Sequence, residues 1–245
     1  MKAGGLVMKK SSVIIAICLV VLLAGALLVK SFSKDEMEAT ALGDSLAYGL
    51  GDTEDNGYIG DVQERYEEET DKRLVVNDYG VPNDTSTDLI KRLKNKQIAE
   101  TAKNSDFIFI NIGTNDFIKS TNRLTKFDKK ELQSNQKIYK DNLNQIIKKV
   151  QEKDSSKTIY ILGIYNPKVK YADMSTVNEA ILNWNRSTIQ VTKEHQNVAF
   201  IRTDDLFINK NKKDYFSDNL HPNEKGYALI GKRVFDTIKK NSNYK

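Results

Sequence analysis

The sequence predicts an α/β fold in which helices cover both faces of a five-stranded parallel sheet. Five short apolar runs recur along the chain, at residues 38–42, 74–79, 106–112, 158–163 and 198–202. Two of them, within residues 106–112 and 158–163, are almost continuously apolar, which is typical of parallel strands buried on both faces. Helical patterns separate the runs. Alternating strands and helices predict a three-layer α/β/α domain.

Four segments carry the helical pattern, with apolar residues at intervals of three and four among Lys, Glu and Gln. They cover residues 86–103, 129–153, 176–195 and 223–240. In the second segment, the expected buried stripe consists of Ile138, Leu143, Ile146, Ile147 and Val150. Together with the strands, these helices form one predicted domain over residues 38–245, which follows a polar linker at residues 31–37.

The first thirty residues have the composition of a membrane-inserting segment. Residues 11–29 carry no charge and consist mainly of Val, Ile, Leu and Ala, close to the roughly 20 apolar residues that span a bilayer. This run exceeds the apolar part of a cleavable signal peptide, so we expect an uncleaved anchor at residues 1–30, with cleavage and secretion as the alternative. Lys9 and Lys10 precede the run, which favours a cytoplasmic N-terminus and a domain outside the cell membrane.

The distribution of charge argues against nucleic acid as a partner. Five lysines and no acidic residue lie in residues 1–34, and the remainder has 33 basic and 33 acidic side chains. Binding along a phosphate backbone needs a clustered basic surface. The single cysteine, Cys18, lies in the apolar run, so the predicted domain has no thiol. Two distant histidines do not make a zinc site, and we expect neither a metal nor another cofactor.

The segment Ser217-Asp218-Asn219-Leu220-His221-Pro222 contains one of only two histidines in the chain. An imidazole base that works near neutral pH commonly relies on a carboxylate to orient it. At a spacing of three, Asp218 can accept the Nδ1 hydrogen of His221 while Nε2 faces a nucleophile. A polar loop before the last helix would contain the same residue types. His195 lies among charged residues at a helix end and is better explained as a surface residue.

Three polar residues follow the first three predicted strands, at the sheet edge where ligands bind in such folds. They are Ser45, Asn83 and Asn115. Gly43 permits a tight turn before Ser45, although an ordinary N-cap serine is the simpler interpretation of these residues alone. Asn115 could donate its amide to an oxyanion or could stabilise a turn.

Together, three blocks of the sequence resemble the SGNH, or GDSL-type, esterase and lipase family. The blocks are Gly43-Asp44-Ser45, Gly113-Thr114-Asn115-Asp116 and Asp218-x-x-His221-Pro222. The resemblance covers nearly the whole predicted domain and implies a flavodoxin-like SGNH hydrolase fold. It also implies Ser45 as nucleophile, His221 as base and Asp218 as its partner. The implied oxyanion donors are the amide of Ser45, the side chain of Asn115 and the amide of Asn83, which stands where the family usually has a glycine.

The resemblance therefore implies a serine carboxylic-ester hydrolase that forms an acyl-enzyme. Its expected substrate is a small-molecule, lipid or carbohydrate ester, and its expected location is outside the cytoplasm. One alternative is a deacetylase of O-acetylated cell-surface polysaccharide or peptidoglycan. Another is a weakly active module that binds a cell-envelope ligand, for which Asn83 is the only argument.

Overall fold

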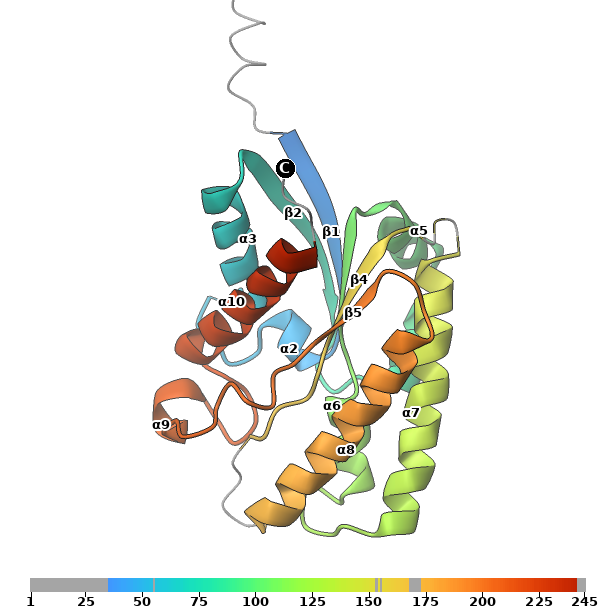
Figure 1. Ribbon diagram of the computed structural model, residues 1–245, viewed down its shortest axis with the longest axis vertical. Coiled ribbons are helices and arrows are strands. Elements are labelled where there is room, and N and C mark those ends of the chain that lie inside the picture. The colour runs from blue at the N-terminus through green and yellow to red at the C-terminus, as the bar shows by residue number, and fades with distance from the viewer. Residues whose placement is uncertain (1–34, 55, 153, 155, 168–172, 242–245) are drawn as a thin grey trace, which may run out of the picture. The chain divides into compact units, whose positions relative to one another are not determined.

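The computed structural model describes residues 35–241, apart from residues 55, 153, 155 and 168–172. Five strands form one sheet in the order β2-β1-β3-β4-β5 (Figure 1). They are β1 (Asp35–Gly43), β2 (Lys72–Gly80), β3 (Phe107–Asn111), β4 (Thr158–Leu162) and β5 (Val198–Ile201). The pairs β1–β3, β3–β4 and β4–β5 are parallel. The predicted α/β sheet is confirmed, and its strand order is the flavodoxin-like one.

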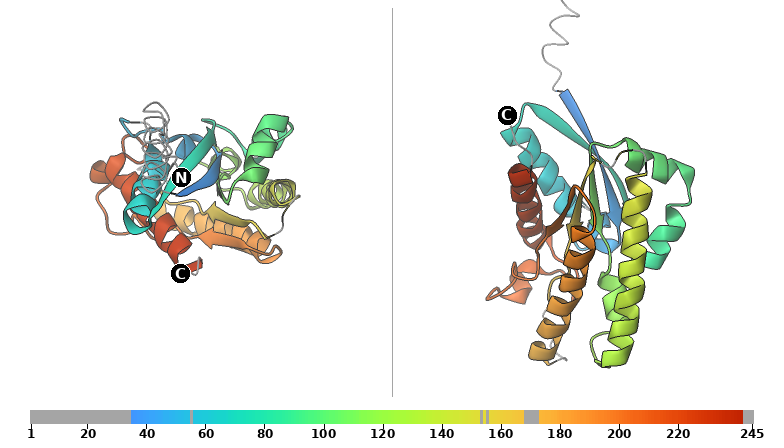
Figure 2. Two further views of the ribbon diagram at one scale, coloured as in Figure 1. Left: turned by 90° about the horizontal axis from the view of Figure 1, so that it is seen from above. Right: turned by 45° about the vertical axis from the view of Figure 1, so that its right-hand side comes forward.

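Helices form a layer on each face of the sheet, as Figures 1 and 2 show. One layer contains α3 (Gly57–Glu69) and α10 (Glu224–Asn241). The other contains α4 (Ser86–Arg92), α5 (Lys96–Asn104), α6 (Thr114–Ser120), α7 (Lys129–Val150) and α8 (Met174–Lys193). Two single-turn helices, α2 (Ser45–Tyr48) and α9 (Lys212–Tyr215), lie in the connections after β1 and β5.

Alternate residues of the central strands enter two hydrophobic cores, one on each face. Ile108 and Ile110 of β3 belong to the core under α4 to α8, whereas Phe109 belongs to the core under α3 and α10. Phe109 stacks on Tyr160 of β4, with ring centroids 5.8 Å apart. Because both faces of the strand are buried, residues 107–110 are all apolar.

Two helical features differ from the prediction. Helix α3 was not expected, because Gly57 and Gly60 and its many acidic residues obscure an apolar face that includes Val62 and Tyr66. The helix predicted at residues 86–103 is two helices, α4 and α5. The chain breaks between them because Asn95 caps α5 by accepting a hydrogen bond from the amide of Gln97.

The buried stripe expected on α7 is also wrong at one position. Ile138 is 48% exposed, and the neighbouring Tyr139 is buried in its place. The other four residues of the stripe are buried as predicted. The aromatic ring of Tyr139 stacks on Trp184 of α8, with centroids 5.2 Å apart, so the α7–α8 contact determines which side of the helix faces inward.

The predicted membrane segment at residues 1–30 lies outside the described residues. Within the described part of the chain, no helix combines the length and the apolar character needed to cross a bilayer. The predicted linker at residues 31–37 lies mostly outside the described residues as well, and β1 begins at Asp35, inside its expected bounds.

Candidate active site

Ser45 lies at a sharp turn between β1 and α2, and it is only 6% exposed. The turn brings Gly43 so close to β3 that a Cβ there would lie 2.4 Å from the carbonyl oxygen of Asn111. The amide of Asp44 donates to that same carbonyl at 3.1 Å. The side chain of Asp44 then caps α2 by accepting the amide hydrogen of Leu46 at 3.0 Å. Glycine is therefore required one position before the cap, and Ser45 follows on the first turn of the helix.

His221 joins Ser45 to Asp218 in a continuous chain of hydrogen bonds. Its Nε2 lies 3.0 Å from Ser45 Oγ, and its Nδ1 lies 2.7 Å from Asp218 Oδ2. In a neutral imidazole with hydrogen on Nδ1, that nitrogen donates to the carboxylate and Nε2 accepts from the serine hydroxyl. The structure thus brings together three residues from the two ends of the domain. Such an arrangement can remove the hydroxyl proton while the oxygen attacks an electrophile.

Asp218 keeps its negative charge because of local hydrogen bonds. Burial alone would raise its pKa, but the hydrogen bonds from the His221 ring and from the amides of His221 and Leu220 outweigh it and leave the pKa below its usual value. Its second oxygen, Oδ1, accepts both amides at 2.6 Å. The carboxylate is 55% exposed, and the imidazole is 15% exposed. Asp218 is therefore an ionised, largely solvated partner of a more buried histidine.

The segment 216–222 is held by a few contacts to the rest of the domain. The hydroxyl of Tyr165 donates to the carbonyl of Leu220 at 2.7 Å. Gly51, with φ of +104°, lies so close that a Cβ would be 2.5 Å from the carbonyl oxygen of Pro222 and 3.0 Å from Cβ of His221. A residue with a side chain at position 51 would therefore push His221 away from Ser45.

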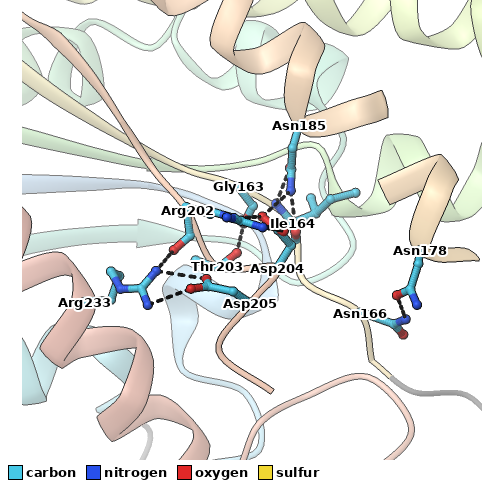
Figure 3. Close-up of polar contacts among 10 residues, drawn as sticks. All are labelled: Gly163, Ile164, Asn166, Asn178, Asn185, Arg202, Thr203, Asp204, Asp205 and Arg233. Carbon is cyan, nitrogen blue, oxygen red and sulfur yellow. Dashed lines mark hydrogen bonds and ion pairs between the residues drawn. The ribbon is translucent and has the colours of Figure 1, made fainter. Parts of the chain in front are cut away.

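A polar cluster ties together the ends of β4 and β5, from which the segment leading to Asp218 departs (Figure 3). The amide side chain of Asn185 exchanges two hydrogen bonds with the backbone of Ile164, at 2.9 and 2.8 Å. Arg233 of α10 donates to both oxygens of Asp205 and to the carbonyl of Arg202. These contacts fix the start of the long connection between β5 and the segment 216–222.

Asn83 follows β2, and Asn115 lies in the first turn of α6, after β3. Asn83 has the left-handed φ of +69°, a conformation that asparagine adopts more readily than most residues with a side chain. Asn115 donates one hydrogen of its Nδ2 to the carbonyl of Asp84 at 2.9 Å, which leaves the second hydrogen for another acceptor. Both asparagines line a cavity of about 750 Å³, together with Asn219 and Leu220.

Arg92 connects the turn before Ser45 to the segment that carries Asn83. From α4, its Nε donates to Asp84 Oδ2 at 2.6 Å, its Nη1 to the carbonyl of Tyr79 at 2.8 Å and its Nη2 to the carbonyl of Gly43 at 2.9 Å. The backbone of Asp84 in turn holds Asn115. Sequence reasoning missed Arg92, because its partners are as far as 49 positions away and no local pattern marks it.

Asp44 is a second residue that sequence reasoning did not single out, although it lies next to Ser45. Its side chain is fully buried, and that burial is the main reason its pKa rises to about 7. The hydrogen bond from Leu46 opposes this rise, and the charges of Asp116 and Asp84 add to it. Among the described residues, none gives a hydrogen bond to Asp44 Oδ2. Asp44 is therefore a buried carboxyl that takes up a proton far more readily than Asp218 does.

Two further expectations concern the second histidine and metals. His195 Nε2 lies 2.7 Å from Asn144 Oδ1 of α7, so the histidine beside Ser45 is His221. Over residues 35–241, with the gaps named above, no group of three or more His, Cys, Asp or Glu side chains is placed to hold a metal ion.

Comparison with known proteins gives consistent matches. Residues 41–229 match the model of the GDSL-like lipase/acylhydrolase family. The protein YpmR of Bacillus subtilis (strain 168) is 30% identical over 213 residues, which cover 85% of this chain and 84% of YpmR. The spore germination lipase LipC of Bacillus licheniformis is 25% identical over 81% of this chain and 94% of its own. The crystal structure of the lipase Lip_vut3 from a goat rumen metagenome superposes with a TM-score of 0.71 at 23% identity, over 81% of this chain and 95% of that one.

Proposed function

This chain belongs to the GDSL-like lipase/acylhydrolase family and is an ester hydrolase, and from that premise we propose that Ser45, His221 and Asp218 form its catalytic triad. The hydrogen-bond chain from Asp218 through His221 to Ser45 carries the proposal. Ser45 and His221 are 176 positions apart, so local sequence does not account for their contact. A module that only binds a ligand would have no need of this alignment, which speaks against the binding alternative.

The proposed reaction has two stages. His221 takes the proton from Ser45 as Oγ attacks the ester carbonyl, and Asp218 stabilises the imidazolium that forms. The oxyanion accepts hydrogen bonds from the amides of Ser45 and Asn83 and from the side chain of Asn115. His221 then protonates the leaving alcohol. Water, activated by the same imidazole, releases the acid from the acyl-enzyme and restores Ser45.

Kinetics of Ser45→Ala test the role of the nucleophile. We expect kcat for a p-nitrophenyl ester to fall about 10⁵-fold, in the range found when a serine hydrolase loses its nucleophile. Ser134→Ala is the matched control, because Ser134 is exposed on α7. It should keep the wild-type rate. Retention of most activity by Ser45→Ala, with both variants folded, would exclude the proposed triad.

We also propose that the domain acts outside the cytoplasm, anchored by residues 1–30. The support is the uncharged run at residues 11–29, preceded by Lys9 and Lys10. If this is correct, the full chain stays in the membrane fraction, and protease added to intact protoplasts digests the domain. A chain found in the soluble cell extract, or one protected from protease in intact protoplasts, would contradict the location.

A further inference from the structure

The cavity beside the candidate site is unusually rich in hydrogen-bond donors. At about 750 Å³ it has the size of a small-molecule site. The described residues of its wall are four asparagines, a lysine, an arginine and four apolar residues. The asparagines include Asn83 and Asn115 as well as Asn219 of the segment 216–222. A bound group in this cavity would therefore lie next to the proposed oxyanion donors.

Among the described residues of the wall, the cations are Lys119 and Arg123. Among the described residues that line the cavity, none is an aspartate or a glutamate. Neither cation forms a salt bridge with another described residue. The carboxylate of Asp116 interacts electrostatically with Lys119, although it does not form a salt bridge with it, and it accepts two hydrogen bonds from Ser86, at 2.9 and 2.6 Å. Outside residues 1–34 the chain has equal numbers of basic and acidic residues, so this wall is a local excess of positive charge.

The backbone around Arg123 is held in an unfavourable conformation. Three consecutive residues, Asn122, Arg123 and Leu124, have left-handed φ angles of +43°, +58° and +66°. Residues with a Cβ lose roughly 1–2 kcal/mol each in that region. The turn is fixed at its ends by Thr121, which is fully buried, and by Leu124, which is 5% exposed in the core. This turn places Asn122 and Arg123 in the wall of the cavity, and strain of this kind is concentrated at functional sites.

We propose that this cavity is an anion subsite, in which Lys119 and Arg123 bind a carboxylate or phosphate group carried by the ester substrate. A guanidinium pairs well with either group, because its parallel N–H donors match two oxygens. The asparagine amides provide further donors. This inference rests on the proposed function of Ser45, because it names a substrate class for the same site. A purely apolar acyl chain bound in this cavity would displace water from these donors and give them no acceptors in return. The loss of those hydrogen bonds costs free energy of binding.

Two matched pairs of esters test the proposal and show which part of the substrate carries the charge. For the acyl side, mono-p-nitrophenyl glutarate is compared with p-nitrophenyl pentanoate, which has the same number of acyl carbons. For the alcohol side, octanoylglycerol phosphate is compared with octanoylglycerol. We expect the wild-type protein to favour the anionic member of at least one pair by about tenfold in kcat/KM, and we expect added salt to reduce that preference.

The double variant K119Q/R123Q should lower this preference by about tenfold, relative to its own rate on the neutral ester of the pair. The matched control is K130Q/R186Q, which removes the same two types of charge from exposed positions on α7 and α8. It should keep the wild-type preference.

The outcomes separate the two proposals. If the wild-type protein favours neither anionic ester, or if K119Q/R123Q keeps a preference that the wild type shows, the anion subsite is wrong while the triad stands. If no ester is hydrolysed faster by the wild type than by Ser45→Ala, the proposed function is wrong and the substrate subsite falls with it.

Discussion

The two halves of the candidate site are held in place by different kinds of structure. Ser45 lies on a turn that is fixed by the sheet. Gly43 packs against β3, Asp44 is fully buried, and Arg92 donates to the carbonyls of Gly43 and Tyr79. His221 and Asp218 lie on the segment 216–222, where the Asp218 carboxylate is 55% exposed. The proposed nucleophile is therefore positioned by the core of the protein. The proposed base and its partner are positioned by a loop and a few hydrogen bonds.

The two aspartates of the site show the same contrast in their electrostatics. Burial raises the pKa of Asp44 to about 7, whereas hydrogen bonds hold the pKa of Asp218 below its usual value against the opposing effect of burial. The same side chain thus has opposite shifts in two environments. The buried one shapes the turn that carries Ser45, and the solvated one remains charged and can stabilise an imidazolium.

The largest expected effect falls on the loop half of the site. His221→Ala removes the proposed base and should lower kcat about 10⁵-fold, while Asp218→Asn should lower it about 10³-fold. The smaller loss at Asp218 follows from its exposure, because water can partly replace the carboxylate. Steady-state kinetics on one p-nitrophenyl ester, with His195→Ala as control, measure both. Equal losses in His221→Ala and His195→Ala would contradict the assignment of the base.

Asp44→Asn tests the buried half through the pH dependence of stability. The raised pKa of Asp44 means that the folded state binds its proton more tightly, so the contribution of this group to stability is full below pH 3.8 and is lost as the pH rises through about 7. Over that window the loss is about 4 kcal/mol. In Asp44→Asn the loss should disappear, and denaturant unfolding at pH 4 and pH 8 measures it.

The corresponding measurement on Asp218→Asn, extended to pH values below 3.8, sharpens the comparison. Because the pKa of Asp218 is lowered, its contribution to stability is present above its unfolded pKa and is lost as the pH falls through the folded one. The variant should therefore change the pH dependence in the opposite direction to Asp44→Asn. A change of the same sign in both variants would refute the contrast between the two carboxylates.

Arg92→Gln should destabilise the half of the site that carries Ser45, although Arg92 is not proposed to contact the substrate. Arg92 and Asp84 are 20% and 14% exposed, and breaking a largely buried pair leaves Asp84 without its partner, at an expected loss of about 2–3 kcal/mol in unfolding free energy. The neighbouring Lys91→Gln breaks only an exposed ion pair and should change stability by less than about 0.5 kcal/mol.

Arg92→Gln should also lower kcat about tenfold, because Arg92 bonds Asp84, which follows Asn83 and whose carbonyl accepts the hydrogen bond from Asn115. Arg92→Lys keeps the charge but loses the fork of donors, so we expect it to restore part of the stability and less of kcat. An unchanged kcat in Arg92→Gln would show that Arg92 stabilises the fold but does not position the oxyanion donors.

Tyr165→Phe should have the smallest effect, on the loop half. It removes the hydrogen bond to the carbonyl of Leu220, which is worth about 1 kcal/mol. We expect kcat to fall about fivefold, because Leu220, whose carbonyl accepts this hydrogen bond, directly precedes His221. Tyr79→Phe removes a comparable hydroxyl, bonded to Thr101 of α5, and should leave kcat as it is. Equal kcat values for the two variants would show that the segment 216–222 does not depend on this bond.

The parts of the fold that could be predicted are those with a local pattern. The strands around Phe109 and Tyr160 are apolar on both faces, and the amphipathic periods of α7, α8 and α10 are long enough to recognise. Helix α3 was missed because its glycines and acidic residues dilute its apolar face. The break at Asn95 was missed because the apolar spacing continues across it.

The same distinction applies to the site. The positions of Ser45, Asn115 and His221 could be expected from short motifs on predicted loops, and the structure brings Ser45 and His221 into contact. Arg92 and Gly51 could not be expected, because each acts on residues distant in sequence, at the carbonyl of Gly43 and against Pro222. Tertiary contacts of this kind leave no periodic trace in the chain.

Fluorophosphonate labelling with peptide mapping tests the central claim most directly, because the reagent reacts with a serine only where a base activates it. The account predicts one adduct, on Ser45, in the wild-type protein. It also predicts that the adduct is lost in His221→Ala while that variant stays folded. An adduct on another serine, or labelling of Ser45 that proceeds at the wild-type rate without His221, would contradict it.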